Sequence, residues 1–280
     1  MKFIVLGSGG CVALPKPLCK CKVCIEAREK GKPYSRFGCS LFLEDLNLLV
    51  DTPEDIVHAL NYADIQEIDS VLYSHIDPDH TLGMRIFEHL RLSWLEISEG
   101  KECSNPISVF AHEEVMSDIN SIGSKLGSYL DYYENTRNII KRYVIEDSTY
   151  LNDIKLSFIK ADYSTIFVFE QDEKKVIYAP CDVKPFPNND IFKDADIMVI
   201  GNTIVGDILK DGYILEEGNS LRDALFTMNE IEQLKARYNI QKVIITHLEE
   251  DWGKSYDDYL ELQKQYNDII FAYDGMIFEV

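Results

Sequence analysis

Four side chains that can bind a metal ion lie close together in the segment 75–80, directly after an apolar run. Imidazole and carboxylate ligands together suit Zn, Mn or Fe, and two such ions about 3.5 to 4 Å apart can clamp a phosphoryl centre and activate a water. We expect His75 and Asp77 to serve one cation. Asp79 and His80, turned by Pro78, would serve another. A polar turn with a helix-capping aspartate is the alternative interpretation, but it leaves both histidines unexplained.

Three of the seven cysteines crowd together at Cys19, Cys21 and Cys24. In a reducing compartment, clustered thiols are more often metal ligands than disulfides. The spacing C-x-C-x-x-C can bring three sulfurs within the short reach that tetrahedral zinc coordination requires. The alternative is a cysteine-rich loop without a metal, because no fourth ligand is adjacent.

Composition limits the classes of partner. The chain has 280 residues, 46% of them hydrophobic and 27% charged, which suits a folded soluble protein. Its formal net charge of -20 repels polyanions, so nucleic-acid binding is disfavoured and a small-molecule substrate is expected. The apolar run at the start is too short for a signal sequence or a membrane span. We therefore expect a cytoplasmic protein with no membrane partner, and a homodimer stays open.

The first half of the chain alternates predicted strands and helices. Strands are predicted at 2–6, 40–44, 47–51, 70–74 and 107–111, and helices at 53–63 and 82–95. The strand at 70–74 delivers the polar cluster at its C-terminal end. We expect a helical insertion at about 112–140 and a cysteine-rich zinc loop at about 11–39.

The second half of the chain also combines predicted strands and helices. Strands are predicted at 154–160, 166–170, 175–179, 197–200, 242–246, 269–273 and 276–280, and helices at 220–238 and 256–266. Hairpins and β-α units occur in both halves, without low-complexity linkers. A single α/β domain of sandwich type over residues 1–280 fits best.

The metal-binding segment resembles the H-x-H-x-D-H signature of the metallo-β-lactamase superfamily. Further segments of that family fall in the expected order: Gly7-Ser8-Gly9, the cysteine run 15–24, Leu49-Val-Asp51, Thr246-His247 and Ala272-Tyr-Asp-Gly275. The resemblance implies an αββα sandwich of two mixed β-sheets flanked by helices. The cysteine run is similar to that of the branch containing the cyclic-phosphate phosphodiesterase of bacterial phosphonate breakdown, and also resembles the pyrroloquinoline quinone biosynthesis branch.

The same resemblance assigns roles to individual residues. His75, Asp79, His80 and His247 match metal ligands, and Asp182 matches the aspartate that bridges two metals. Asp79 and Asp182 would be the catalytic carboxylates, with Asp182 orienting a metal-activated water. Zn, or Mn or Fe, is the expected catalytic metal, as one or two ions.

Two positions depart from the family pattern. Asp77 stands where the family has a histidine, and a second histidine expected near Lys160 is absent, with Asp162 or Tyr163 in its neighbourhood. One metal position would therefore be richer in oxygen ligands. Such a position should bind Zn less well and favour Mn or Fe, or stand empty.

The cysteine cluster also differs from the family pattern. In the phosphodiesterase branch a histidine completes this structural zinc site, and Glu250 stands at that position here. A Cys3Glu zinc site is chemically feasible, whereas a solvated acidic run at 249–251 is the alternative. Asp51, which ends a predicted strand, is expected to orient a metal ligand through a hydrogen bond. Cys181 is interpreted as a packed thiol beside Asp182.

These features favour a metal-dependent hydrolase, a phosphodiesterase that acts on a small, cyclic phosphodiester or a related ester through metal-activated water. A non-catalytic or vestigial metal-binding protein is the alternative from another class, because two family histidines are missing. An RNA-processing nuclease is a further alternative that the acidic composition opposes.

Overall fold

Two seven-stranded sheets form the centre of the computed structural model, which describes residues 1–280. The first sheet has the order β18 (Ile277–Glu279), β1 (Lys2–Gly7), β2 (Ser40–Leu43), β3 (Leu48–Val50), β4 (Ser70–Leu72), β5 (Ile107–Ala111) and β8 (Ile140–Val144). The second has the order β17 (Ile269–Phe271), β16 (Lys242–Ile245), β13 (Ile197–Ile200), β12 (Lys174–Ala179), β11 (Thr165–Gln171), β10 (Ile154–Lys160) and β9 (Ser148–Leu151). Both sheets contain parallel and antiparallel pairs.

The central strands of both sheets are buried on both faces, which explains their nearly continuous apolar sequences. Successive side chains of a strand point to opposite faces. Phe3 and Val5 of β1 accordingly belong to the core between the two sheets, together with Phe167 of the second sheet. Ile4 and Leu6 of the same strand belong to the core between the first sheet and its helices. Each sheet therefore packs one face against the other sheet and its opposite face against helices.

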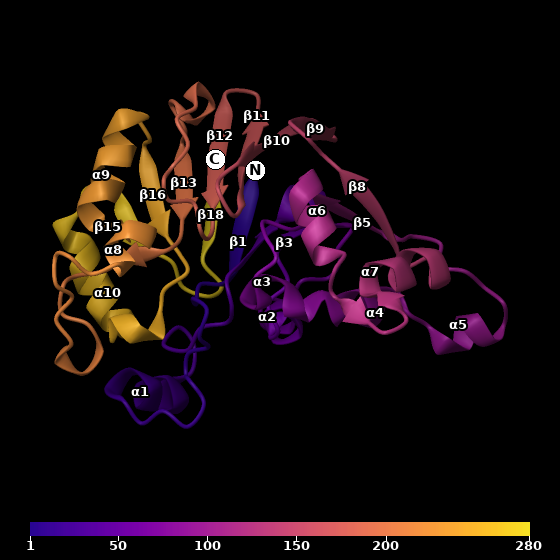
Figure 1. Cartoon of the computed structure of the whole chain (residues 1–280), viewed down its shortest axis with the longest axis horizontal. Helices are drawn as coiled ribbons and strands as arrows, with labels where there is room; N and C mark the ends of the chain where they lie inside the picture. The colour runs from indigo at the N-terminus through magenta and orange to yellow at the C-terminus, as the bar shows by residue number, and fades with distance from the viewer.

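Helices cover both outer faces (Figure 1). On the first sheet lie α2 (Ile56–Tyr62), α3 (Pro78–Thr81), α4 (Ile86–Arg91), α6 (Glu113–Ile119) and α7 (Tyr129–Asp131), whereas α5 (Trp94–Ser98) projects away from the sheet. On the second lie α8 (Leu221–Ala224), α9 (Met228–Arg237) and α10 (Tyr256–Leu262). α1 (Lys22–Lys30) lies apart, below the sheets. This is the αββα sandwich of two mixed sheets that the sequence predicts.

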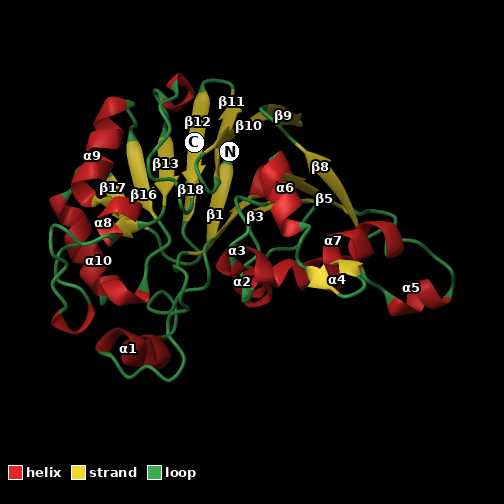
Figure 2. Cartoon of the chain, viewed as in Figure 1, coloured by secondary structure: helices red, strands yellow, loops and turns green.

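The two ends of the chain meet beside β1 and β18, where the amino group of Met1 donates to the carbonyl oxygen of Val280 at 3.1 Å. The region between the lower ends of the strands and α1 is mostly loop (Figure 2). Loops at strand ends commonly carry binding residues, because the sheets hold them rigidly in place. No helix of the chain has the length and apolar character that crossing a bilayer requires.

Three predicted helices are interrupted. The helix predicted at 82–95 breaks before Ser93, whose side chain accepts from the backbone of Glu96 and starts α5. The helix predicted at 220–238 is divided by the short strand β15 (Phe226–Thr227). Thr227 and Glu230 then form a capping box that starts α9. The helix predicted at 256–266 ends as α10 at Leu262, and a short 3-10 turn follows it.

The segment 112–140, expected to be helical, is helical only in parts. α6 is followed by a small hairpin of β6 (Gly123–Ser124) and β7 (Gly127–Ser128), then by α7 and a π-helical turn. A Cβ atom on Gly123 would lie 2.4 Å from the carbonyl oxygen of Gly127, so the hairpin depends on glycine there. The edge strands β8 and β9 were not predicted.

Candidate metal centre and adjoining pocket

The segment 73–81 connects β4 to α3 and carries the predicted ligands. Pro78 is the first residue of α3, where its missing N–H costs no helical hydrogen bond. Asp79 and His80 therefore lie on the helix, whereas His75 and Asp77 lie in the loop before it. The hydroxyl of Thr81 donates to the carbonyl oxygens of residues 76 and 77 at 2.9 and 3.0 Å, which closes the loop onto the helix.

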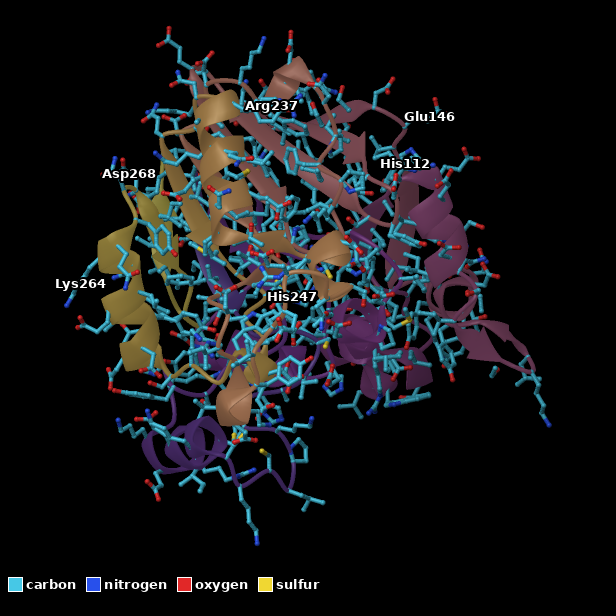
Figure 3. All side chains as sticks on the ribbon, turned by 60° about the vertical axis from the view of Figure 1, so that its left-hand side comes forward. His112, Glu146, Arg237, His247, Lys264 and Asp268 are labelled. Carbon is cyan, nitrogen blue, oxygen red and sulfur yellow. The ribbon has the colours of Figure 1, made fainter.

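The second sheet supplies the remaining residues. Cys181 and Asp182 follow β12, and His247 follows β16. Both strands run parallel to β13 between them, so their C-terminal ends meet at the same edge of the sheet. Figure 3 shows His247 near the middle of the molecule, whereas Lys264 and Asp268 lie at its periphery. The first and second sheets thus bring their strand-end residues to one place.

Three overlapping groups of side chains could hold a metal ion, with ligand atoms within 4.8 Å of one another in each group. They are Asp79, His80 and His247; His75, Asp77 and Asp182; and His75, His80 and Cys181. In the first group, Oδ2 of Asp79 lies 3.6 Å from Nε2 of His80 and 3.4 Å from Nε2 of His247. In the second, Nε2 of His75 lies 3.7 Å from Oδ2 of Asp77.

The Nε2 atoms of His75, His80 and His247 are buried and have no hydrogen-bond partner. A buried polar atom without a partner costs free energy of about 1 to 3 kcal/mol, so three convergent ones require an explanation. Neutral imidazole nitrogens beside carboxylates are ordinary ligands of divalent transition metals. The donor set therefore fits the metal that the sequence analysis expects.

Asp51 holds two of these histidines in orientation. It follows β3, whose parallel neighbour β4 precedes the metal loop, and its carboxylate is fully buried. Oδ2 of Asp51 lies 2.9 Å from Nδ1 of His80 and accepts from Oγ of Ser74 at 2.6 Å. Oγ of Ser74 in turn lies 2.9 Å from Nδ1 of His75. Both rings are therefore held through Nδ1, which leaves Nε2 for a metal.

The charges within the centre are strongly coupled. Burial lowers the pKa of His80, but the charge and the hydrogen bond of Asp51 outweigh burial and raise this pKa well above its usual value. Burial raises the pKa of Asp79, but the close approach of His247 and the charges of His80 and His247 hold this pKa well below its ordinary value. Asp79 is therefore ionised at neutral pH and could bind a cation.

Cys181 occupies a different position from the one expected. It is only 5% exposed and lies within the histidine cluster instead of packing against apolar side chains. Burial raises the pKa of its thiol, but the charge of His247 and the close approach of the three histidine rings hold the pKa well below its ordinary value. One signal for Cys181 was visible in the sequence, because this residue directly precedes Asp182 just after a predicted strand.

Asp182 lies with His75 and Asp77 instead of joining the group of Asp79, His80 and His247. Its backbone is left-handed, with φ of 49°. Nδ2 of Asn202 donates to its Oδ1 at 3.1 Å. Asp162 and Tyr163, considered as substitutes for a missing histidine, line a small cavity beside His75, but neither belongs to a ligand group.

A cavity of about 660 Å³ opens onto the centre. Asp79, Asp182 and His247 lie on its lining, and Leu209, Leu221, Leu225 and Trp252 form an apolar wall. Six carboxylate residues line it, namely Asp77, Asp79, Asp182, Asp211, Glu249 and Asp251, against the single basic residue Lys210. The pocket therefore attracts cations and accommodates a small ligand.

The cysteine cluster forms a second candidate site at the edge of this pocket. Oε1 of Glu250 lies 3.5, 3.2 and 3.1 Å from the sulfurs of Cys19, Cys21 and Cys24, respectively. Four ligand atoms in one compact group are what a tetrahedral structural zinc requires. Lys210, which sequence analysis did not single out, forms an ion pair with Glu250. Burial raises the pKa of Glu250, but Lys210 and the thiols outweigh it and lower the pKa to about 2.

A family model described as a beta-lactamase superfamily domain matches residues 46–248, a range that contains the centre but neither the three cysteines nor Glu250. No curated protein sequence matches the chain.

Solved structures show the same fold along the whole chain. A diphosphatase from the PhnP family is 16% identical with a TM-score of 0.69, covering 100% of this chain and 97% of its own. Zn²⁺-bound PqqB from Methylobacterium extorquens is 17% identical with a TM-score of 0.72, covering 100% of both chains. The short form of human tRNase Z is 14% identical with a TM-score of 0.63, covering 100% of this chain and 99% of its own.

Proposed function

This chain belongs to the metallo-β-lactamase superfamily, and on that basis we propose that it is a metal-dependent hydrolase that cleaves a small phosphodiester or a related ester. The observation that carries the proposal is the convergence of three buried, unpartnered histidine nitrogens at one centre, with Asp79 and His247 reaching the floor of a cavity. Histidine and carboxylate ligands that face a substrate-sized cavity are typical of catalytic metal sites.

Each residue of the centre has a defined task in this proposal. Asp79, His80 and His247 would hold one divalent metal, which supplies a water of lowered pKa and a Lewis acid for the scissile group. His75, Asp77 and Asp182 would hold a second cation. Because these ligands include two carboxylates and one imidazole, this position favours harder metals such as Mn or Fe.

Side chains around the proposed metal centre would orient the water and the metal ligands. Asn202 donates to Oδ1 of Asp182, which leaves Oδ2 of that carboxylate to accept a hydrogen bond from the attacking water. Burial raises the pKa of Asp182, and the charge of the nearby Cys181 adds to this effect. Asp51 keeps His80 in the ring orientation that binding requires.

The volume and the lining of the pocket limit the size and the charge of the substrate. Its volume suits a molecule of metabolite size, and its apolar wall offers contact to a hydrophobic or aromatic group. With one basic residue, Lys210, which is already paired to Glu250, the pocket gives no support to a chain of phosphates. A single phosphodiester, neutralised by bound cations, is compatible with it, and a long RNA is disfavoured.

The test is hydrolysis of bis-p-nitrophenyl phosphate and of 2′,3′-cyclic nucleotides by protein loaded with Zn²⁺ or Mn²⁺. We expect metal-dependent turnover that His247→Ala abolishes. His58→Ala is the matched control, because His58 is exposed and belongs to no ligand group. A fully metallated protein that cleaves neither phosphodiesters nor carboxylic esters would instead be the non-catalytic metal-binding protein.

A further inference from the structure

The thiol of Cys181 lies among the metal-binding histidines. Cys181 is the second residue after β12 ends at Ala179, and it is 5% exposed. Its sulfur and the ring nitrogens of His75 and His80 all lie within 4.8 Å of one another. A sulfur in this position is close enough to share a metal with either ring.

The groups around Cys181 suit a sulfur that accepts hydrogen bonds instead of donating one. Nδ2 of Asn202, an amide donor, lies 3.3 Å from the Cys181 sulfur. The facing Nε2 atoms of His75 and His80 are buried and have no hydrogen-bond partner. Donors that point at a sulfur are typical of the groups that support a metal-bound thiolate. The cluster therefore lacks only a cation between the sulfur and the rings.

Cys39 shows what a buried but merely packed cysteine looks like in this protein. It is 1% exposed, and its sulfur lies 3.5 Å from the hydroxyl of Tyr178 and 3.8 Å from that of Thr246. It belongs to no group of potential metal ligands. Burial alone therefore does not account for the position of Cys181.

We propose that the thiolate of Cys181 is a metal ligand of this centre, where it lies with His75 and His80 and shares His80 with the group of Asp79 and His247. The proposal rests on the proposed function, because it concerns the same centre. On metal binding the thiol proton is released to solvent and a metal–sulfur bond forms, without any change of oxidation state. Asp182 is then left to the neighbouring position with His75 and Asp77.

The two metal positions would differ in chemical character. Sulfur and imidazole ligands are soft or intermediate, and they suit Zn²⁺ or Co²⁺. The position with Asp77 and Asp182 is rich in oxygen and suits Mn²⁺ or Fe²⁺. The centre is therefore built for two unlike metals, with zinc preferred beside Cys181.

X-ray absorption at the cobalt edge tests the thiolate directly. The protein keeps zinc at the cysteine cluster, while the catalytic position is emptied by mild chelation and refilled with Co²⁺; zinc analysis verifies that the cluster zinc stays. Since only cobalt is observed, the three cluster cysteines do not contribute. We expect a sulfur neighbour at about 2.3 Å, the usual metal–thiolate distance.

Two variants accompany the measurement on the unsubstituted protein. Cys181→Asp should retain cobalt but lose the sulfur neighbour, whereas Cys103→Ser, outside every ligand group, should keep it. If cobalt in the unsubstituted, active protein had only nitrogen and oxygen neighbours, the proposal that Cys181 is a thiolate ligand would be wrong. The proposed hydrolase function would still hold. If no metal bound outside the cysteine cluster, both proposals would fail.

Discussion

Nζ of Lys210 lies 2.6 Å from Oε1 of Glu250, the carboxylate oxygen that is also nearest to the three cysteine sulfurs. Three thiolates and a carboxylate carry more negative charge than one Zn²⁺ neutralises. Lys210 offsets part of this excess and holds the carboxylate in place, since it also lies 2.8 Å from Oε2. The carboxylate of Glu250 is thus accompanied by a lysine from a part of the chain distant in sequence.

Removing that lysine should weaken the cluster. We expect Lys210→Met to lower the zinc affinity of the cysteine cluster by about 10- to 100-fold, the usual effect of losing a group that supports a metal ligand. Competition with a chromophoric chelator measures this affinity. Lys264→Met is the control, because Lys264 is exposed and pairs only with Glu261. Equal affinities in the two variants would contradict the role of Lys210.

The cysteine cluster should contribute to stability and not to the reaction. Cys21→Ala removes one sulfur ligand, so we expect loss of one zinc equivalent and a lower melting temperature, because zinc binding at such sites is coupled to folding. Activity per catalytically metallated, folded molecule should persist. Cys103→Ala is the matched control. Unchanged zinc content and unchanged melting temperature in Cys21→Ala would refute the structural role.

The catalytic metal should depend on His247. Its Nε2 lies 3.4 Å from Oδ2 of Asp79 and is buried without a hydrogen bond, so His247→Ala removes one ligand of the proposed centre. We expect loss of one metal equivalent by elemental analysis, with the zinc of the cysteine cluster retained. If total metal stayed the same in His247→Ala, the assigned centre would be wrong.

Asp51 should control metal affinity without touching the metal. Asp51→Asn preserves the shape of the side chain but removes the charge that binds Nδ1 of His80 and Oγ of Ser74. We expect metal affinity to fall by about 10- to 100-fold. Isothermal titration of the metal-depleted protein measures it. Asp45→Asn serves as a control, because Asp45 lies at the protein surface and belongs to no ligand group.

Asp77 should set the metal preference of the second position. A carboxylate there binds harder cations better than an imidazole does. We expect added Mn²⁺ to raise activity more than added Zn²⁺, and Asp77→His to improve zinc retention without giving full activity, because the second missing histidine is not restored. Two tightly bound zinc ions at the catalytic centre of the parent protein, with occupancy unchanged in Asp77→His, would contradict this prediction.

Local sequence determined much of this protein. The continuous apolar runs of β1, β12 and β13 predicted buried strands, because a strand that is covered on both faces needs apolar side chains on both. The residues 75–80 and the three cysteines are close in sequence, so their joint position in space follows from short-range geometry. The resemblance to a known superfamily then supplied the distant partners, such as His247.

The tertiary structure decided what depends on distant contacts. Whether Cys181 or Asp182 enters the histidine cluster turns on the backbone direction after β12, because adjacent side chains beyond a strand point to opposite sides, and the left-handed conformation of Asp182 turns its side chain toward His75 and Asp77. Lys210 reaches Glu250 from a loop 40 residues away in sequence. Such pairings have no periodic signature, because they arise only when the packed sheets bring separate loops to the same edge.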